Sequence, residues 1–315
     1  MRDIPFPEKF LLGSPSPWVR YQARAALLGE PGTTERRELL AHPVVRQLLK
    51  EAQSWPGNSQ GDHRSAKDLL NKLSLLADFG LCASDPGVRR FVERVLSHVG
   101  DDGRLLGHVL FPKAAKPAWI FDVDGQDTLL ALVALGCAGD RRVKRVLTAV
   151  IALESAGGGW VWPDARSPLP CRRFTGGCPY PTVKILRVLS RAPTSETAAV
   201  ARRGTDLLLS LWDQRDTERR YGFGMADQFL KLRYPFIWFD VLHVLEALSP
   251  YRWAWSDRRF HSLLGAVLGK ADGQGRFTPE SVYLEWRDQC FGQKREPSPW
   301  LTFIVHRILS RRPEN

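Results

Sequence analysis

Three acidic residues stand close together in front of an apolar segment. Asp122, Asp124 and Asp127 precede residues 129–136, which are all apolar or glycine. Neighbouring carboxyl groups in a buried place can keep one of their number protonated, and that group can then act as a general acid. The alternative is helix capping, because acidic side chains stabilise the first turn of a helix. The three acids are therefore candidate catalytic residues, and capping is the simpler explanation.

Aromatic residues recur at or just before the starts of the apolar segments. If these starts meet at one end of the fold, the rings converge there and could bind an apolar ligand. A lysine, an aspartate and a histidine at the same level could add polar contacts. The alternative is that the rings only fill the ends of the segments. The predicted substrate-binding residues are Trp119, Tyr180, Lys184, Tyr234, Trp238, Asp240, His243 and Trp300.

The elements that carry these residues recur along the chain. Five apolar segments end at residues 80, 136, 190, 249 and 310, which lie 56, 54, 59 and 61 residues apart. An amphipathic stretch with helical spacing follows most of them, as in 88–96, 143–151 and 259–268. Next comes a turn in which glycine supplies a positive φ and a large apolar residue folds back under the helices. These turns are Gly103-Arg-Leu105, Gly158-Gly-Trp160, Tyr221-Gly-Phe223 and Gly275-Arg-Phe277.

Each unit is predicted to be an inner helix, an outer helix and a glycine turn. The inner segments are apolar almost all round, which predicts burial on both sides. We predict an all-α protein with about five such units, forming a single domain over residues 1–315. Residues 1–60, with helix candidates at 18–28 and 44–52, are an opening helical hairpin, and residues 61–312 hold the repeats.

The repeat length and the glycine turn resemble those of the terpenoid cyclase and protein prenyltransferase superfamily. Gly158-Gly-Trp160 matches the end of its Gln-x-x-Gly-x-Trp signature, with Ser155 in place of the glutamine. The resemblance spans about residues 60–312. It implies an α/α toroid, a barrel of helical hairpins whose inner helices surround a central apolar cavity.

The acids resemble the Asp-x-Asp-Asp motif of the class II terpene cyclases in that superfamily. The resemblance implies that Asp124 is the acid that protonates an alkene or epoxide, with Asp122 as its partner. Gly125 stands where the motif has its next aspartate, so the match is partial.

A second resemblance, to protein prenyltransferases, concerns metal binding. In that family an Asp, a Cys and a His from consecutive inner helices bind zinc, and Cys178, Asp240 and His243 have a similar layout. Three such ligands and an open position form a catalytic zinc site. Gly176 stands where the family's aspartate is expected. The alternative is that Cys178 is a buried thiol and His243 a core histidine.

The composition limits the partners and the location. The net charge is +11, but the basic residues come as scattered pairs such as Arg89-Arg90 and Arg141-Arg142. Scattered pairs favour solvated outer helices, so nucleic acid is not the favoured partner, and a basic helical-repeat protein that binds nucleic acid is kept as a fourth hypothesis. No apolar run is long enough to cross a membrane, which leaves peripheral membrane contact open. Five cysteines without a CxxC pair, and no apolar signal region near the start, predict reduced thiols and a cytoplasmic location.

The leading hypothesis is a terpenoid cyclase-like protein that binds, and could cyclise, an apolar isoprenoid-type substrate in an aromatic-lined cavity. A second hypothesis, of another class, is a non-catalytic ligand-binding or scaffold toroid. Gly125 and Gly176 favour it, because each replaces an aspartate that a family motif requires. A third is a zinc-dependent prenyltransferase-like enzyme.

Overall fold

The computed structural model describes residues 3–55, 65–67, 69–105, 107–109, 118–120, 123–161, 177–215 and 226–314. Within these ranges it describes no side chain at residues 70, 107–109, 118–120, 123, 124, 226 and 227. The regular structure there is helical apart from two three-residue strands. The prediction of an all-α protein is therefore confirmed.

The chain forms two compact units. Unit 1 comprises Met1–Pro43 and Leu208–Asn315, and unit 2 comprises Val44–Leu207. The 19-residue helix α10 (Ser195–Asp213) starts in unit 2 and ends in unit 1.

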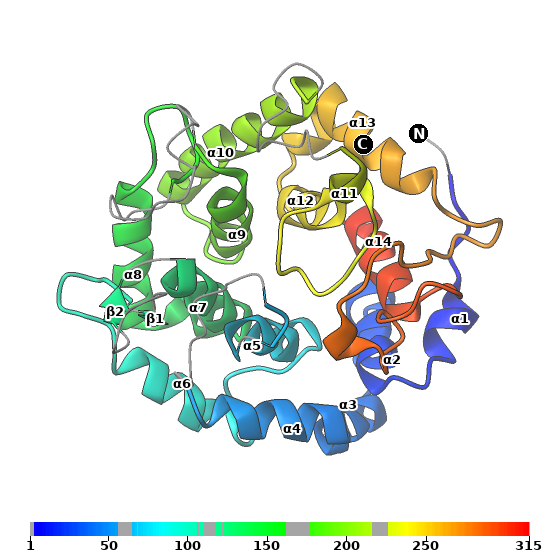
Figure 1. The fold of residues 1–315 in the computed structure, drawn as a ribbon, viewed down its shortest axis with the longest axis horizontal. Helices are drawn as coiled ribbons and strands as arrows, with labels where there is room; N and C mark the ends of the chain where they lie inside the picture. Colours follow the sequence, from blue (N-terminus) through cyan, green and yellow to red (C-terminus); the bar gives the residue numbers. More distant parts are fainter. Residues whose placement is uncertain are drawn as a thin grey trace. The chain divides into compact units, whose positions relative to one another are not determined.

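In unit 2, three largely apolar helices pack side by side. Helix α7 contacts both α5 and α9, and α6 and α8 lie outside them (Figure 1). All of α9 is buried, whereas α6 buries only one face. The elements of this unit are α4 (Pro43–Ala52), α5 (Leu69–Asp78), α6 (Val88–Leu96), α7 (Val123–Ala134), α8 (Arg141–Ala152), α9 (Pro179–Leu189) and the antiparallel strands β1 (Gly107–Val109) and β2 (Ala118–Ile120).

In unit 1, the buried helices are α12 and α14. Helix α12 contacts α13 and α14, and α14 also contacts α1 and α2. Every residue of α12 is buried, which agrees with its apolar sequence. The helices of this unit are α1 (Glu8–Leu12), α2 (Pro17–Ala23) with a following π-helical turn (Arg24–Leu28), α3 (Thr33–Ala41), α11 (Ala226–Leu230), α12 (Val241–Leu248), α13 (Arg258–Leu268) and α14 (Pro299–Ser310).

The helix positions agree with most of the sequence predictions. The inner helices α5, α7, α9, α12 and α14 end within two residues of the predicted closing positions. The opening segment is more than a hairpin, because α3 lies between the two predicted helices. Its sequence is mostly polar and buries only Leu39, so it carries little amphipathic signal. The predicted loop at 58–64 and the turn Tyr221-Gly-Phe223 lie outside the described residues.

The three described glycine turns share one hydrogen-bonding pattern. In each turn, the N–H of the residue that starts the turn donates to the carbonyl of the residue four positions later, as Gly100 does to Arg104. The N–H of the positive-φ glycine donates to the carbonyl of the starting residue, as Gly103 does to Gly100. The large residue two positions after the glycine is buried in every case. The turns start at Gly100, Ser155 and Asp272, their glycines are Gly103, Gly158 and Gly275 (φ +76°, +83° and +73°), and their buried residues are Leu105, Trp160 and Phe277.

Two of these turns are also joined to the next inner helix in the same way. The Trp160 N–H donates to Thr182 Oγ1 of α9 at 3.0 Å, and the Phe277 N–H donates to Thr302 Oγ1 of α14 at 3.0 Å. Each threonine lies in the first turn of its helix. The repeat seen in the sequence therefore extends to individual hydrogen bonds.

The glycine turns give a stability prediction. A Cβ on Gly103 would lie 2.8 Å from the Arg145 carbonyl oxygen, whereas one on Gly136 (φ +93°) would meet nothing within 4 Å. Gly103→Ala should therefore cost more than Gly136→Ala, which carries only the φ strain of about 1–2 kcal/mol. Gly265→Ala, inside α13 with open space around it, should stabilise by about 0.5–1 kcal/mol. Urea unfolding of the three variants measures this order, and equal costs at Gly103 and Gly136 would refute the close-approach argument.

Candidate functional site

Helix α9 of unit 2 carries a buried polar stripe. Tyr180, Lys184 and Arg187 are only 1–2% exposed, in a helix whose other residues are mostly apolar. Their spacing of four and then three residues places them on one face of the helix. Burying two cations on one helix is costly unless each meets an acid.

Lys184 meets its acid on α7. Its ammonium group forms an ion pair with Asp127 Oδ1, donates to the Tyr180 hydroxyl and lies 3.8 Å from the centre of the Tyr180 ring. Burial raises the pKa of Asp127, while the charges of Lys184 and Arg187 act to lower it. Asp127 therefore lies in a buried ion pair at the fifth residue of α7, one position beyond its first turn.

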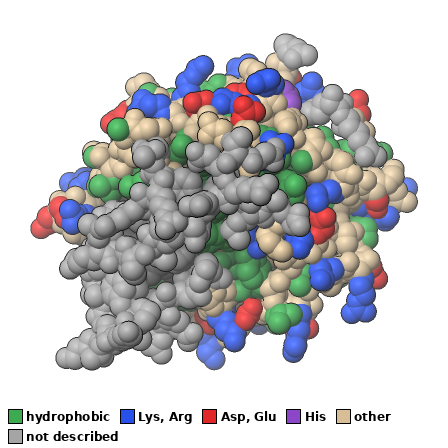
Figure 2. All heavy atoms as spheres, turned by 45° about the horizontal axis from the view of Figure 1, so that its top comes forward, with side chains coloured by type: hydrophobic (Ala, Val, Ile, Leu, Met, Phe, Trp, Pro, Cys, Tyr) green, Lys and Arg blue, Asp and Glu red, His purple; other side chains and the backbone are tan. Residues whose placement is uncertain are grey.

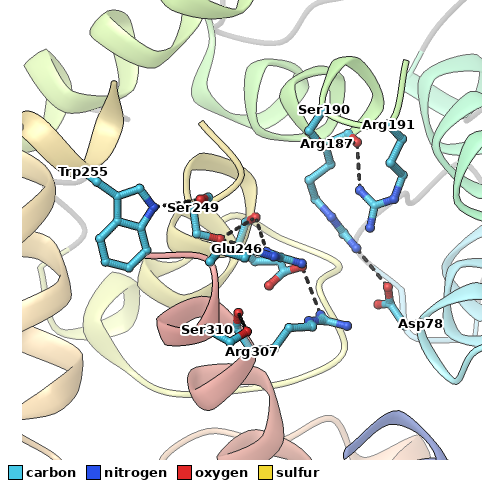
Figure 3. A network of polar contacts seen from close by, with 10 residues as sticks. Asp78, Arg187, Ser190, Arg191, Glu246, Ser249, Trp255, Arg307 and Ser310 are labelled. Carbon is cyan, nitrogen blue, oxygen red and sulfur yellow. Dashed lines mark hydrogen bonds and ion pairs between the residues drawn. The ribbon is translucent and has the colours of Figure 1, made fainter. Parts of the chain in front are cut away.

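Arg187 meets its acid on α5. Its Nη2 lies 3.0 Å from Asp78 Oδ1, and both side chains are less than a tenth exposed (Figure 3). Asp78 is the last residue of α5, and Arg187 is in the last turn of α9. The stripe on α9 thus joins two neighbouring inner helices through opposite charges.

The Lys184–Asp127 pair can be tested against an exposed pair. Lys184→Met should destabilise the protein by about 3–5 kcal/mol, because it leaves a buried carboxylate without its cation. Lys270→Met should cost about 1 kcal/mol or less, since the Lys270–Glu280 pair is 27% and 37% exposed. The double variant Lys184→Met/Asp127→Leu should recover most of the loss. Equal costs for the two single variants in chemical unfolding would contradict this view of the pair.

Unit 1 holds a buried aromatic cluster before and within α12 and α14. The ring of Tyr234 meets Phe236, Phe291 and Trp300 edge-on, at centroid distances of 4.9–5.5 Å. His243 stacks on Phe236 at 4.8 Å, and its Nδ1 donates to the Trp238 carbonyl at 3.2 Å. Four of the predicted substrate-binding residues (Tyr234, Trp238, His243 and Trp300) are therefore brought together.

Asp240 lies beside this cluster as the N-cap of α12. Its Oδ1 accepts from the His243 N–H at 2.9 Å, and its Oδ2 accepts from Arg233 Nε at 3.0 Å. Burial raises the pKa of Asp240 to about 6, and Arg233 and the backbone N–H groups oppose this rise. Burial likewise raises the pKa of Tyr283, beside Arg233, to about 12. Titratable groups shifted in this way are common at functional sites.

The pKa of Asp240 gives a pH prediction. Because the folded pKa of about 6 lies above the ordinary 3.8, the folded protein holds this proton more tightly than the unfolded chain does. The contribution to stability is therefore complete below about pH 4 and is lost as the pH rises to about 6, by up to about 3 kcal/mol.

Asp240→Asn keeps an N-cap but cannot ionise. The stability of this variant relative to the native protein should rise between pH 4 and 6 and stay level above that. Asp257→Asn is a matched control, because Asp257 also caps a helix and binds an arginine but has a lowered pKa. If the relative stability of Asp240→Asn falls with pH instead, the Arg233 ion pair lowers the pKa of Asp240 by more than burial raises it.

Glu246 of α12 binds two arginines of α14. Its Oε1 lies 3.0 Å from Nη2 of Arg307 and 3.0 Å from Nη2 of Arg311, and its side chain is 1% exposed (Figure 3). Arg311 also donates to Ser249 Oγ at 2.8 Å, just after the end of α12. This ionic contact between inner helices, like Asp78–Arg187, lies at their carboxyl ends.

The residues of these carboxyl-end pairs were not among the predicted site residues. A signal was present, because four of the five apolar segments carry one charged residue near their ends. The phrases are Leu76-Ala-Asp78, Leu186-Arg187-Val-Leu-Ser190, Leu245-Glu246-Ala-Leu-Ser249 and His306-Arg307-Ile-Leu-Ser310. A charge inside a buried helix predicts a partner of opposite sign on a neighbour.

Some predicted site residues fall outside the description. Asp122 lies outside the described residues, and the side chains of Asp124 in α7 and Trp119 in β2 are not described. The structure therefore places only Asp127 of the three candidate catalytic acids.

The predicted zinc ligands have other roles where the structure describes them. Cys178 is the N-cap of α9, the position that Ser298 holds in α14. Asp240 caps α12, and His243 donates to a backbone carbonyl. Among the described residues, no three His, Cys, Asp or Glu side chains lie close enough together to hold a metal ion.

Comparisons with known proteins do not assign a family. No family model and no curated protein matches the chain. One similar solved structure is titled "Crystal structure of a protein from Actinoplanes"; it is 15% identical, with a TM-score of 0.43, over 94% of this chain and 89% of that one. A TM-score this low supports no conclusion about fold or function. No helix of the described part is long and apolar enough to cross a membrane.

Proposed function

We propose that the chain is an α/α toroid that binds an apolar, isoprenoid-type ligand without cyclising it. The main observation behind this proposal is that each described acidic side chain on an inner helix forms an ion pair with a lysine or arginine. Asp78 meets Arg187, Asp127 meets Lys184, and Glu246 meets Arg307 and Arg311. The cap residue Asp240 meets Arg233 in the same way.

These pairs argue against proton donation to an alkene. A donor carboxyl must reach the substrate, whereas a cationic partner occupies an oxygen of each of these carboxyl groups, including Asp127 and Asp240, whose pKa burial raises. The described charges thus suit a framework role better than acid catalysis.

Ligand binding is supported by the aromatic cluster of unit 1. Tyr234, Phe236 and Trp300 are buried, while Trp238 is half-buried at the start of α12. Aromatic faces of this kind suit an apolar chain with double bonds. The toroid arrangement itself rests on the repeat of inner helices and on the shared geometry of the glycine turns.

The first test is for a bound ligand. Native mass spectrometry of the purified protein, followed by solvent extraction, should show a co-purified or added linear polyprene that is released chemically unchanged. Trp238→Ala should weaken its binding about tenfold or more, because a stacking surface is lost. Trp253→Ala is the matched control, since Trp253 is also half-buried and stacked, on Tyr251, but lies beyond the other end of α12.

The second test is for turnover. Incubation with a linear polyprene or a prenyl diphosphate should yield no cyclic product by gas chromatography and mass spectrometry. A cyclic product that Asp124→Asn abolishes would overturn the proposal in favour of a cyclase with Asp124 as its acid. Failure to bind any polyprene would show that polyprenes are not the ligand. Equal binding by the Trp238→Ala and Trp253→Ala variants would show that the aromatic cluster is not the binding site.

A further inference from the structure

The positive charge of the chain is concentrated on three outer helices of unit 2. Helices α4, α6 and α8 hold nine basic residues and two acidic ones, an excess of seven, whereas the whole chain has a net charge of +11. Helix α10 has two arginines and three acids, and α13 has two basic residues. On the face that Figure 2 presents, basic and acidic side chains are interspersed.

The two acids on these helices are already neutralised. Glu93 of α6 is bound by Arg142 of α8 at 3.1 Å, and Glu51 of α4 is bound by Lys72 at 2.7 Å. Of the nine basic residues, Arg142 is used in this way and Arg94 is half-buried and donates to the Gln53 carbonyl. The other seven are exposed and have no ion-pair partner among the described residues, and we call them the basic face. They are Arg46 and Lys50 on α4, Arg89 and Arg90 on α6, and Arg141, Lys144 and Arg145 on α8.

Helix α6 lies between the other two helices and adjoins both (Figure 1). The Gln53 side chain, just after α4, donates to the Gly87 carbonyl, just before α6, at 2.7 Å. The Arg142–Glu93 ion pair then joins α8 to α6. Residues as far apart in the chain as Arg46 and Arg145 therefore contribute to one surface, which the sequence shows only as separate pairs.

We propose that the basic face binds the phosphate backbone of double-stranded nucleic acid without reading its sequence. Five of its seven residues are arginines, whose planar guanidinium groups match phosphate oxygens. The only aromatic residue on the three helices is Phe91, which is buried, so no ring is available to stack on an unpaired base.

A membrane surface fits these helices less well. Helices that lie on membranes insert an apolar face between the lipids. Here the apolar faces of α6 and α8 are buried within unit 2, through Phe91, Val92, Val146 and Val150 among others. The contact left to these helices is electrostatic.

The test is fluorescence anisotropy with a labelled, mixed-sequence DNA duplex at several salt concentrations. Sequence-independent binding should have a Kd of roughly 1–100 µM at physiological salt, and the slope of log K against log salt should be about −4 to −6. The variant R89Q/R90Q/R141Q/K144Q/R145Q should bind at least about 100-fold more weakly at low salt. Its slope should be smaller in magnitude by several units, because each lost phosphate contact removes about one.

A matched control removes the same charges from unit 1. R252Q/R258Q/R287Q/K294Q/R295Q also replaces four arginines and one lysine, all exposed, so both variants have the same net charge. The control should change affinity by less than about fivefold and leave the slope intact. Equal losses in the two variants, or a slope near zero, would overturn the proposal. So would binding through these residues to phosphatidylcholine–phosphatidylglycerol vesicles but not to the duplex.

Discussion

Buried ion pairs join the inner helices within each unit of this protein. An ionised side chain between packed helices is tolerated only with a partner of opposite sign, so each such pair fixes how two helices meet. In unit 2, Lys184–Asp127 joins α9 to α7, and Arg187–Asp78 joins α9 to α5. In unit 1, Glu246 with Arg307 and Arg311 joins α12 to α14. Apolar surfaces alone would allow the inner helices to slide or rotate, whereas these pairs select one register.

Much of the helical framework could be predicted from the sequence, because its signals are local. The periodicity of residues 88–96 and 259–268 and the glycines at 103, 158 and 275 depend only on near neighbours, and the structure has the expected helices and turns. Helix α3 could not be predicted in this way, since a helix that buries one leucine has hardly any amphipathic pattern.

The candidate site was harder to predict, because pairing is a property of the packed state. The sequence grouped Asp127 with Asp122 and Asp124 by proximity, whereas the fold pairs it with a lysine 57 residues away. Asp240 could be predicted as a cap, but its contact with Arg233 depends on how the preceding segment folds back. The basic pairs likewise appeared scattered until the fold placed α4, α6 and α8 in succession along the outside of unit 2 (Figure 1).

The glycine turns have a consequence for how such chains diverge. Each turn is closed by its own backbone hydrogen bonds, and at residue 155 a serine hydroxyl also donates to the Gly158 carbonyl. Only a glycine and a bulky apolar residue two positions later are common to all three, and that residue varies from leucine to tryptophan to phenylalanine. A turn that requires only these two residues can keep its geometry while nearly all of the surrounding sequence changes. Common ancestry among chains with such turns would remain detectable in the spacing of the turns after sequence identity had become too low to show it.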